Sequence, residues 1–423
     1  MTRVVVVGGG IAGLTVAWAW KAKGAQVTVL EGSPDAGGVL GTDHHGPWLF
    51  ERAAQTMRGG HGVPHRLIHA LGLGEQVVVS EPGRPALLHQ GKVAPLSPWG
   101  VVAGRPLSCR ATWRALREPW IPPVPNPEET VDAFLRRRLG DGVADTLGGA
   151  LLGGVTGGDP KELEVGGVFP AWVEAERRGG LFRGRAPADA SAPRRPWTLR
   201  PGWQALVDAL VSAVEAVHYD TQAVRIDADG PGWVVFARGG SFEADHVVLA
   251  APPSAAADLV GGDPTEFPTH SLASVHLGFE DAKKRRGFGW LADPRERTDA
   301  LGILWVSDIL PHTAPPGHRL VRVMMGGGRH PDSARGTDAE LIAAAQRVLQ
   351  EVEGVTGPPV VTHVRRVRIP QATRGHHGRL RALAARAPGI HWLGWGTHGP
   401  GLVDTIVNAL AAPAQGPALA TRV

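Results

Sequence analysis

The chain opens with two apolar runs separated by a segment of helical pattern. Val4–Val7 is an unbroken run of β-branched residues, as expected for a strand that is buried on both faces. From Ile11 to Lys23 the spacing of apolar residues predicts a helix, which Gly24 ends. A second apolar run at Val27–Leu30 predicts another strand. The order strand, helix, strand indicates a βαβ unit and therefore an α/β fold with a parallel sheet.

Three glycines connect the first strand to the helix in the spacing Gly8-x-Gly10-x-x-Gly13. Gly8 permits a tight turn, Gly10 lets the backbone approach a pyrophosphate, and Gly13 lets the helix pack closely on the strand. The start of the helix then directs its N–H groups towards the phosphates. Glu31 follows the second strand, where a carboxylate can bind both hydroxyls of an adenosine ribose. The pattern predicts NAD or FAD rather than NADP, and a βαβ unit without a nucleotide is the alternative.

A second helix start bounded by glycines is predicted near the other end of the chain. Gly399–Gly401 precedes the apolar segment Leu402–Leu410, so the first N–H groups of this helix are free to stabilise negative charge. A reduced flavin carries such a charge at its N1–C2=O edge. Ala250–Pro253 follows a buried strand and predicts a turn of small residues, as expected where the backbone lies against a cofactor.

The composition narrows the compartment and the class of protein. With 423 residues, 43% of them hydrophobic, the chain is long enough for two or three domains with a large core. The single cysteine, Cys109, excludes an internal disulfide and a cysteine-based zinc site, and it fits a reducing cytoplasm. No apolar run is long enough to span a bilayer, and the first residues have a strand pattern rather than that of a signal peptide.

The charge balance is modest, with 44 Lys and Arg residues against 40 Asp and Glu. Basic residues cluster at Arg136–Arg138 and Lys283–Arg286, and such clusters are either anion-attracting patches or solvated faces. No basic surface interleaved with aromatic residues is visible, so we predict no nucleic-acid partner.

Histidines at positions 61, 65 and 69 are spaced one helical turn apart. Two histidines at this spacing can bind zinc, but no acidic residue completes a ligand set here. We therefore predict a solvated helix face and no metal site.

Five segments resemble, in the same order, those of the protoporphyrinogen oxidases, which belong to the FAD-dependent, amine-oxidase-type flavoproteins. The segment EGSPDAGG (31–38) resembles the extension after the second strand, where paired glycines run beside the pyrophosphate. The others are the helical segment 129–184, the strand-rich segment 287–328, RIPQATRGHHGRL (368–380) and the closing motif GIHWLGWGTHGPGLVDTIVNAL (389–410). The resemblance runs almost from end to end, and the order of its motifs is more specific than any one of them.

The element pattern and the resemblance together imply a Rossmann-type FAD-binding domain with a mixed-sheet substrate domain and a helical insertion. The FAD-binding domain is expected to be discontinuous, built from residues 1–60, 200–262 and 380–423. The arginine-rich helical insertion covers 90–199, and the substrate domain covers 263–379. Two further points are left open: whether the insertion contacts the cytoplasmic face of a membrane, and whether the protein forms a homodimer.

The cofactor-binding residues that follow from the glycine loop and the resemblance come from five parts of the chain. They are Gly8, Gly10, Ile11, Ala12, Gly13, Glu31, Gly37, Gly38, Val224, Ala251, Trp395, Gly401, Leu402 and Val403.

The resemblance also implies residues that hold the substrate. Arg84 lies near the position of the family's carboxylate-binding arginine, and Arg58 is a rival for the same role. Leu291, Ile303 and Met325 are candidates for an apolar wall, with an ordinary core position as the alternative. No catalytic side chain is assigned, because flavin N5 performs the chemistry.

The activity implied by the resemblance is oxidation of protoporphyrinogen IX to the porphyrin in haem biosynthesis, with FAD as cofactor and molecular oxygen as acceptor. Coproporphyrinogen III oxidation and an amine-oxidase-type oxidase or desaturase of another substrate are the enzymatic alternatives. A non-catalytic binding protein of the same fold is the third. Five differences from the family pattern motivate these alternatives: Asp35, Val39, Ala53, Ala54 and Trp395.

Overall fold

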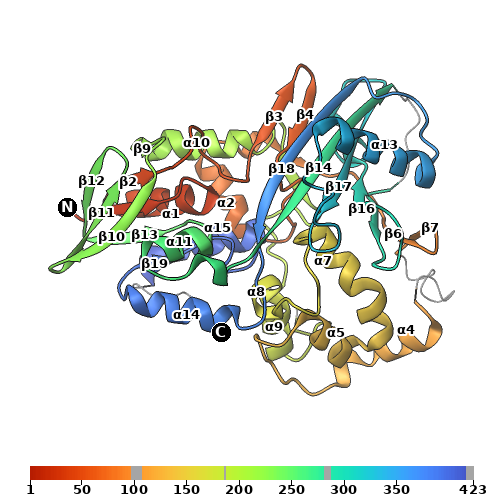
Figure 1. Ribbon diagram of the computed structural model, residues 1–423, viewed down its shortest axis with the longest axis horizontal. Coiled ribbons are helices and arrows are strands. Elements are labelled where there is room, and N and C mark those ends of the chain that lie inside the picture. Colours follow the sequence, from red (N-terminus) through yellow and green to blue (C-terminus); the bar gives the residue numbers. More distant parts are fainter. Residues whose placement is uncertain (97–106, 185–186, 281–286, 416–423) are drawn as a thin grey trace.

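The computed structural model describes residues 1–96, 107–184, 187–280 and 287–415, and the basic cluster Lys283–Arg286 lies outside these ranges. Figure 1 shows two lobes, with a parallel sheet and its helices on the left and a second sheet, mostly in blue and teal with the edge strands β6 and β7 in orange, on the right. A group of short helices, drawn in yellow, lies below the second sheet. The predicted α/β fold class, with a mixed second sheet and a helical insertion, is confirmed.

A five-stranded parallel sheet forms the centre of the first lobe. Its strands, in spatial order, are β19 (His391–Trp392), β13 (His246–Leu249), β1 (Arg3–Val7), β2 (Gln26–Leu30) and β9 (Val217–His218). The two predicted strands are confirmed, and the predicted helix is α1 (Ile11–Lys21), which ends two residues earlier than expected. Gly24 follows with a φ of +81°, a conformation that glycine adopts without strain.

Packing on both faces of this sheet explains the unbroken valine run of β1. Val4 and Val6 lie in the core on the side of α1, whereas Val5 and Val7 lie in the core of the opposite face. On the α1 side the sheet is also covered by α10 (Gln204–Val214) and α15 (Leu402–Ala411). The opposite face is covered by α11 (Pro253–Leu259), α14 (His376–Arg386) and an antiparallel sheet of β10 (Ala223–Asp229), β11 (Gly232–Ala237) and β12 (Gly240–Ala244).

The second sheet has seven strands and mixed polarity. Its spatial order is β18 (Val361–Pro370), β14 (Thr269–Glu280), β17 (His318–Gly326), β16 (Ala300–Leu304), β15 (Gly289–Ala292), β6 (Pro85–His89) and β7 (Lys92–Pro95). Neighbours pair antiparallel except β15 and β6, which are parallel. Helix α13 (Asp338–Glu353) packs against one face.

Side chains of the second sheet alternate between the α13 face and the face that is turned away from it. Ala273 and Met325 are opposite each other in β14 and β17, and both lie in the core under α13. The next pair, Ser274 and Met324, therefore faces away from α13, because successive side chains of a strand point to opposite faces. This phase decides which residues of β17 can border a ligand.

The insertion is mainly helical. Its helices are α4 (Cys109–Leu116), α5 (Val131–Leu139), α6 (Asp141–Val143), α7 (Gly149–Val155), α8 (Val165–Val168) and α9 (Pro170–Arg177), with a π-helical turn at Ala144–Gly148. Strand β7 lies within the segment 90–199 that is predicted as the insertion, but it pairs with β6 in the second sheet. The division of the chain into domains is therefore proposed with β7 on the substrate side.

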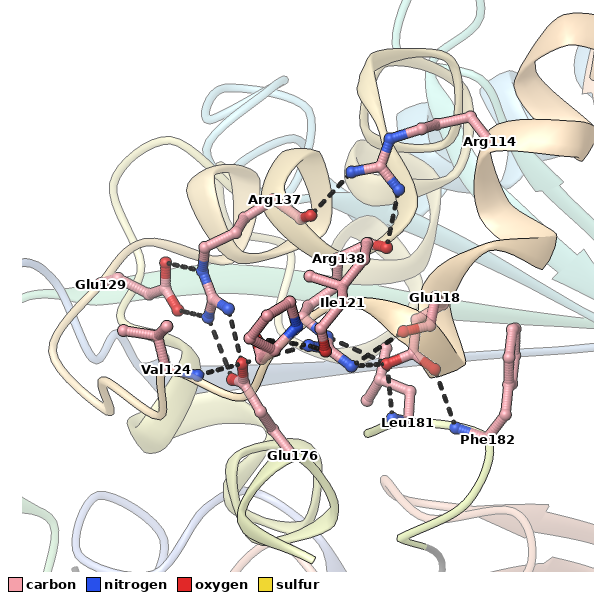
Figure 2. Close-up of polar contacts among 11 residues, drawn as sticks. Arg114, Glu118, Ile121, Val124, Glu129, Arg137, Arg138, Glu176, Leu181 and Phe182 are labelled. Atoms are coloured by element: carbon pink, nitrogen blue, oxygen red, sulfur yellow. Dashed lines mark hydrogen bonds and ion pairs between the residues drawn. The ribbon is translucent and has the colours of Figure 1, made fainter. Parts of the chain in front are cut away.

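The basic cluster Arg136–Arg138 is neutralised inside the insertion, as Figure 2 shows for two of its members. Arg137 is bonded to Glu129 and Glu176, and Arg138, which is fully buried, is bonded to Glu118. Arg136 forms ion pairs with three aspartates, Asp132, Asp141 and Asp145. The cluster is thus not an anion-attracting patch, because its charges are compensated by acids of the insertion; Arg138 is buried, whereas Arg136 and Arg137 are partly exposed.

The remaining strands form two small sheets, and two further helices are short. Strands β3 (Thr42–His45) and β4 (Trp48–Glu51) form a hairpin, β5 (Val77–Val79) pairs with β8 (Trp197–Leu199), and the two short helices are α2 (Gly62–Ala70) and α12 (Val306–Ile309). Throughout the described ranges, no helix combines the length and the apolar character that crossing a bilayer requires.

Candidate functional site

A cavity of about 1110 Å³ lies between the parallel sheet and the second sheet. The last residues of β1 and β2, Val7 and Leu30, border it, and so do Ala250 and Gly394, which follow β13 and β19. The cavity is therefore at the carboxyl ends of the parallel strands, where open α/β sheets bind their ligands. Its volume exceeds the roughly 300–1,000 Å³ of pockets for drug-sized molecules, so it can hold a dinucleotide together with part of a second molecule.

The glycine loop after β1 has the close backbone contacts that its sequence predicts. A Cβ at Gly8, where φ is +105°, would lie 2.8 Å from the carbonyl oxygen of Ala250. A Cβ at Gly13 would lie only 1.9 Å from the carbonyl oxygen of Gly8. Both positions therefore require glycine, the first for the turn against Ala250 and Ala251 and the second for the approach of α1 to its own strand.

The start of α1 is left open for an anion. Its N-cap residue, Gly10, makes no side-chain cap, and the first turn contains no acidic residue. Gly10, Ile11 and Ala12 all border the cavity. Because the first N–H groups of a helix have no intrahelical acceptor, they are available to phosphate oxygens at this point.

A second pair of glycines, Gly37 and Gly38, lies beside the glycine loop and the start of α1, and we call these three parts together the glycine cradle. Gly37 donates its N–H to the carbonyl oxygen of Gly9 at 2.8 Å, and it forms an isolated bridge with Gly10. Gly37 and Gly38 have φ of +101° and +62°, and both border the cavity. Their side-chain-free backbone leaves room beside the start of α1.

The carboxylate of Glu31 is fixed at the edge of the cavity by two backbone groups. Its Oε2 accepts a hydrogen bond from Gly9 N at 2.7 Å and its Oε1 accepts one from Ser33 N at 2.8 Å. A carboxylate offers about four acceptor sites, so two remain for other donors. This geometry fits the predicted binding of two ribose hydroxyls.

The start of α15 opens on the same cavity as the start of α1. Pro400, Leu402 and Thr405 border the cavity, and the N-cap residue Gly401 again makes no side-chain cap. The two helices pack against each other in the first lobe. Two helix starts from opposite ends of the sequence therefore face one cavity, which neither element could show alone.

Most of the predicted cofactor-binding residues are brought together here. Those that border the cavity are Gly8, Gly10, Ile11, Ala12, Glu31, Gly37, Gly38, Val224, Ala251, Trp395 and Leu402. Gly13 lies behind the loop, Gly401 precedes α15, and the side chain of Val403 is buried in the core between α1 and α10. Four of the five differences from the family pattern, Val39, Ala53, Ala54 and Trp395, also border the cavity, whereas Asp35 is exposed outside it.

The predicted apolar wall is present in part. Leu291 borders the cavity beside α7, and Ile303 borders it while belonging to the core under α13. Met325 lies wholly in that core, and its neighbour Met324 borders the cavity instead. The prediction chose the wrong one of two adjacent methionines, because a shift of one residue along a strand moves a side chain to the other face. Leu272 of β14 borders the cavity on the same face as Met324.

Neither predicted arginine borders the cavity. The side chains of Arg84 and Arg58 are both exposed, and the Arg84 carbonyl accepts a hydrogen bond from Phe288 N at 3.3 Å. A different arginine, Arg322 of β17, is buried and borders the cavity. The sequence does contain an indication of Arg322, because it is the only charged residue in the apolar strand pattern 320–325, but it is not among the residues predicted from the sequence.

Two of the histidines singled out in the sequence, His65 and His69, lie on α2 (Gly62–Ala70). His65 and His69 are in edge-to-face contact, and His65 also packs against Trp197. Burial lowers the pKa of both His61 and His65. In the part of the chain that the structure describes, no three His, Cys, Asp or Glu side chains converge as metal ligands would.

The fold and the cavity together define a two-lobed protein whose cavity lies at the place where open α/β sheets bind dinucleotides. The chain belongs to the family of flavin containing amine oxidoreductases, whose model matches residues 11–409. It is therefore a flavin-dependent oxidoreductase, and the glycine cradle, the Glu31 carboxylate and the open start of α15 fit such a cofactor.

Similar proteins cover almost the whole chain. It is 26% identical over 455 residues to the coproporphyrinogen III oxidase of Bacillus subtilis (strain 168), with 97% of each chain covered. It is 30% identical over 442 residues to the protoporphyrinogen oxidase of Bos taurus, with 90% of each chain covered. A solved structure from Exiguobacterium sp. 255-15 has the same fold, with a TM-score of 0.79, 24% identity and 97% of each chain covered.

Three buried histidines, His376, His391 and His398, are expected to make the protein sensitive to acid. Burial lowers the pKa of His376, His391 and His398 from the ordinary 6.5 to about 4. Between these values the unfolded chain binds protons that the folded chain does not, so stability falls as the pH is lowered, by up to about 1.4 kcal/mol per pH unit for each histidine. Glu51 has the opposite effect on stability, because burial raises its pKa to about 8 and the folded chain therefore keeps a proton that the unfolded chain loses. This single group is outweighed by the three histidines.

The urea midpoint is therefore expected to be lower at pH 5 than at pH 7. His391→Phe, which removes one of the buried histidine rings, should reduce the difference. His44→Gln, a change of an exposed histidine in β3, should leave it as it is. Equal urea midpoints at pH 5 and pH 7 would contradict the conclusion that the buried histidines make the protein sensitive to acid.

Proposed function

We propose that this protein is an FAD-dependent oxidase that converts protoporphyrinogen IX to the porphyrin in haem biosynthesis, with oxygen as electron acceptor. The observation that carries the proposal is the single cavity that runs from the glycine cradle to an apolar wall on the second sheet. The names of the relatives support a porphyrinogen as substrate, since both oxidise one.

Different residues along this cavity would bind the cofactor and position the substrate. Gly10, Ile11 and Ala12 offer N–H groups to the pyrophosphate, and Glu31 offers acceptors to the ribose. When bound, FAD would supply a two-electron acceptor. The apolar side chains of Leu272, Leu291 and Met324 would exclude water and hold a flat tetrapyrrole in place, so that positioning rather than a nucleophilic side chain promotes the reaction.

Anaerobic mixing tests this function. The purified protein is expected to be yellow, and its flavin absorbance is expected to bleach when protoporphyrinogen IX is added without oxygen and to return when oxygen is admitted. Faster bleaching by coproporphyrinogen III would transfer the proposal to that substrate. Bleaching only by putrescine or cyclohexylamine would favour an amine oxidase, and a colourless protein that FAD cannot reconstitute would favour a binding protein.

We further propose peripheral contact of the insertion with a membrane. Trp113 and Trp120 are 71% and 72% exposed, and Leu116 lies between them. Arg110 and Arg117 are exposed beside these side chains, and a surface of aromatic and basic residues is typical of segments that lie on anionic lipid. Co-sedimentation with phosphatidylglycerol vesicles should decrease in the double variant Trp113→Ser/Trp120→Ser, and equal sedimentation of both proteins would refute the contact.

A further inference from the structure

A buried guanidinium, that of Arg322 in β17, forms part of the cavity wall. Its neighbours in the wall, Leu272, Leu304 and Met324, are apolar. The residue is only 7% exposed. Moving a cation from water into such surroundings costs several kcal/mol unless other groups compensate for the lost hydration.

The compensation inside the protein is incomplete. Arg322 donates from Nε and from Nη2 to Ser274 Oγ, at 3.0 and 2.6 Å, and from Nη1 to the carbonyl oxygen of Ala53 at 2.6 Å. A guanidinium has five N–H groups, so five minus three leaves two N–H groups that find no acceptor in the described part of the chain.

Ser274, which also borders the cavity, is saturated as an acceptor but not as a donor. Both acceptor sites of its Oγ are occupied by Arg322. Among the residues that the structure describes, its own O–H has no acceptor. Donors therefore exceed acceptors at this point of the wall, which is the condition for binding an anion.

The positive charge of Arg322 is likewise not balanced by a carboxylate. Within the described ranges, no Asp or Glu oxygen lies within ion-pairing distance of its guanidinium. Burial lowers the pKa of Arg322 to about 10, so the side chain stays charged at neutral pH. Glu51 is the carboxylic acid whose charge would act on Arg322. Burial raises the pKa of Glu51 to about 8, so Glu51 is mostly protonated and uncharged at pH 7. A net positive charge thus faces the cavity.

We propose that Arg322 and Ser274 form an anion-recognition site in the wall of the cavity. The site would take either a carboxylate of the substrate or the negatively charged edge of the bound flavin, and the inference rests on the proposed function only for the first of these. Arginine suits this role better than lysine, because its planar fork can keep Ser274 and Ala53 in place while two further N–H groups bind the ligand.

Variants of the holoenzyme separate the two sources. Arg322→Met removes the charge, and Arg322→Lys retains the charge without the fork. Arg366→Met is the matched control, because Arg366 lies in β18, is exposed, and is paired with Asp338 away from the cavity. The measurements are the midpoint potential of the bound flavin and the KM for protoporphyrinogen IX and for its dimethyl ester.

If the site binds a substrate carboxylate, Arg322→Met should raise the KM for the free acid by about tenfold to hundredfold and leave the KM for the ester nearly unchanged. If it binds the flavin, Arg322→Met should lower the midpoint potential and change the kcat for acid and ester alike. Arg322→Lys should fall between wild type and Arg322→Met in either case. The proposal would be overturned if Arg322→Met kept the wild-type flavin potential and the wild-type ratio of the KM for the acid to the KM for the ester. The arginine would then be only a structural link between β17 and Ala53.

A failure of the proposed function is distinguishable from a failure of this inference. If no porphyrinogen bleaches the flavin, the site is still tested with benzoate and its neutral isostere benzamide, whose binding is followed by the flavin spectrum. Arg322→Met should then weaken the binding of benzoate at least tenfold more than the binding of benzamide, or else lower the midpoint potential of the flavin. If the methionine variant does not fold, Ser274→Ala, which removes one donor to the anion, takes its place with the same readouts.

Discussion

Replacing Gly13 with alanine is expected to abolish flavin binding. The added Cβ would lie 1.9 Å from the carbonyl oxygen of Gly8 and 3.2 Å from Cγ1 of Val6. The first of these is a backbone atom of the loop that cradles the pyrophosphate, so α1 has to move away from β1. The helix start and the glycine loop then lose their common orientation, on which the binding of phosphate by N–H groups depends.

The measurement is the ratio of flavin to protein absorbance after purification and after reconstitution with FAD. Gly378→Ala is a suitable control, because Gly378 lies inside α14 and its added Cβ would have only the end of the Arg381 side chain, 3.9 Å away, as a neighbour. Since alanine favours a helix by up to about 1 kcal/mol over glycine, this control should keep its flavin and gain stability. Full flavin content in Gly13→Ala would show that the loop does not hold the cofactor.

The second large effect is expected in the insertion, where replacing Arg138 with methionine should destabilise the protein by about 3–5 kcal/mol. Arg138 and Glu118 are both fully buried. Arg138 Nε donates to Glu118 Oε1 at 2.9 Å, and Nη1 donates to the carbonyl oxygen of Ile121 at 2.9 Å. Glu118 Oε1 also accepts from Leu181 N at 2.7 Å, as Figure 2 shows. Without Arg138, the Glu118 carboxylate is left buried without its cation.

Arg136→Met is the control for this prediction. Arg136 lies two residues away in the same helix, but its aspartate partners are partly exposed, and pairs of that kind contribute about 1 kcal/mol or less. Urea unfolding should separate the two variants clearly. The double variant Arg138→Met/Glu118→Leu should recover part of the loss, because it removes both charges together. Equal midpoints for Arg136→Met and Arg138→Met would mean that the buried network does not stabilise the fold.

These variants probe different properties of the same molecule. Gly13 controls whether the cofactor is held, whereas Arg138 controls the stability of the insertion, whose helix α7 borders the cavity through Gly153 and Gly154. A variant of Arg138 that folds at low temperature is therefore expected to bind flavin normally. Loss of flavin in both variants would indicate that the insertion also helps to close the cavity.

The sequence by itself determined the elements whose signal is local. The valine run, the glycine spacing and the helix after it lie within one stretch of 28 residues, 3–30, and α1, β1 and β2 follow them within two residues at each end. The second helix start, before Leu402, was equally readable from its glycines. In these segments the backbone requirements of turns and helix ends select the residue types directly, so the pattern and the structure agree.

Only the tertiary structure decided which side chains meet in the cavity. Met324 rather than Met325 borders it because the pairing of β17 with β14 sets the phase of the strand, and that pairing depends on residues some 50 positions away in the chain. Arg322 reaches the wall for the same reason, and the acids that neutralise Arg137 and Arg138 come from other segments of the insertion. Strand register and the choice of charge partners arise from contacts between distant segments, and a local pattern carries no information about them.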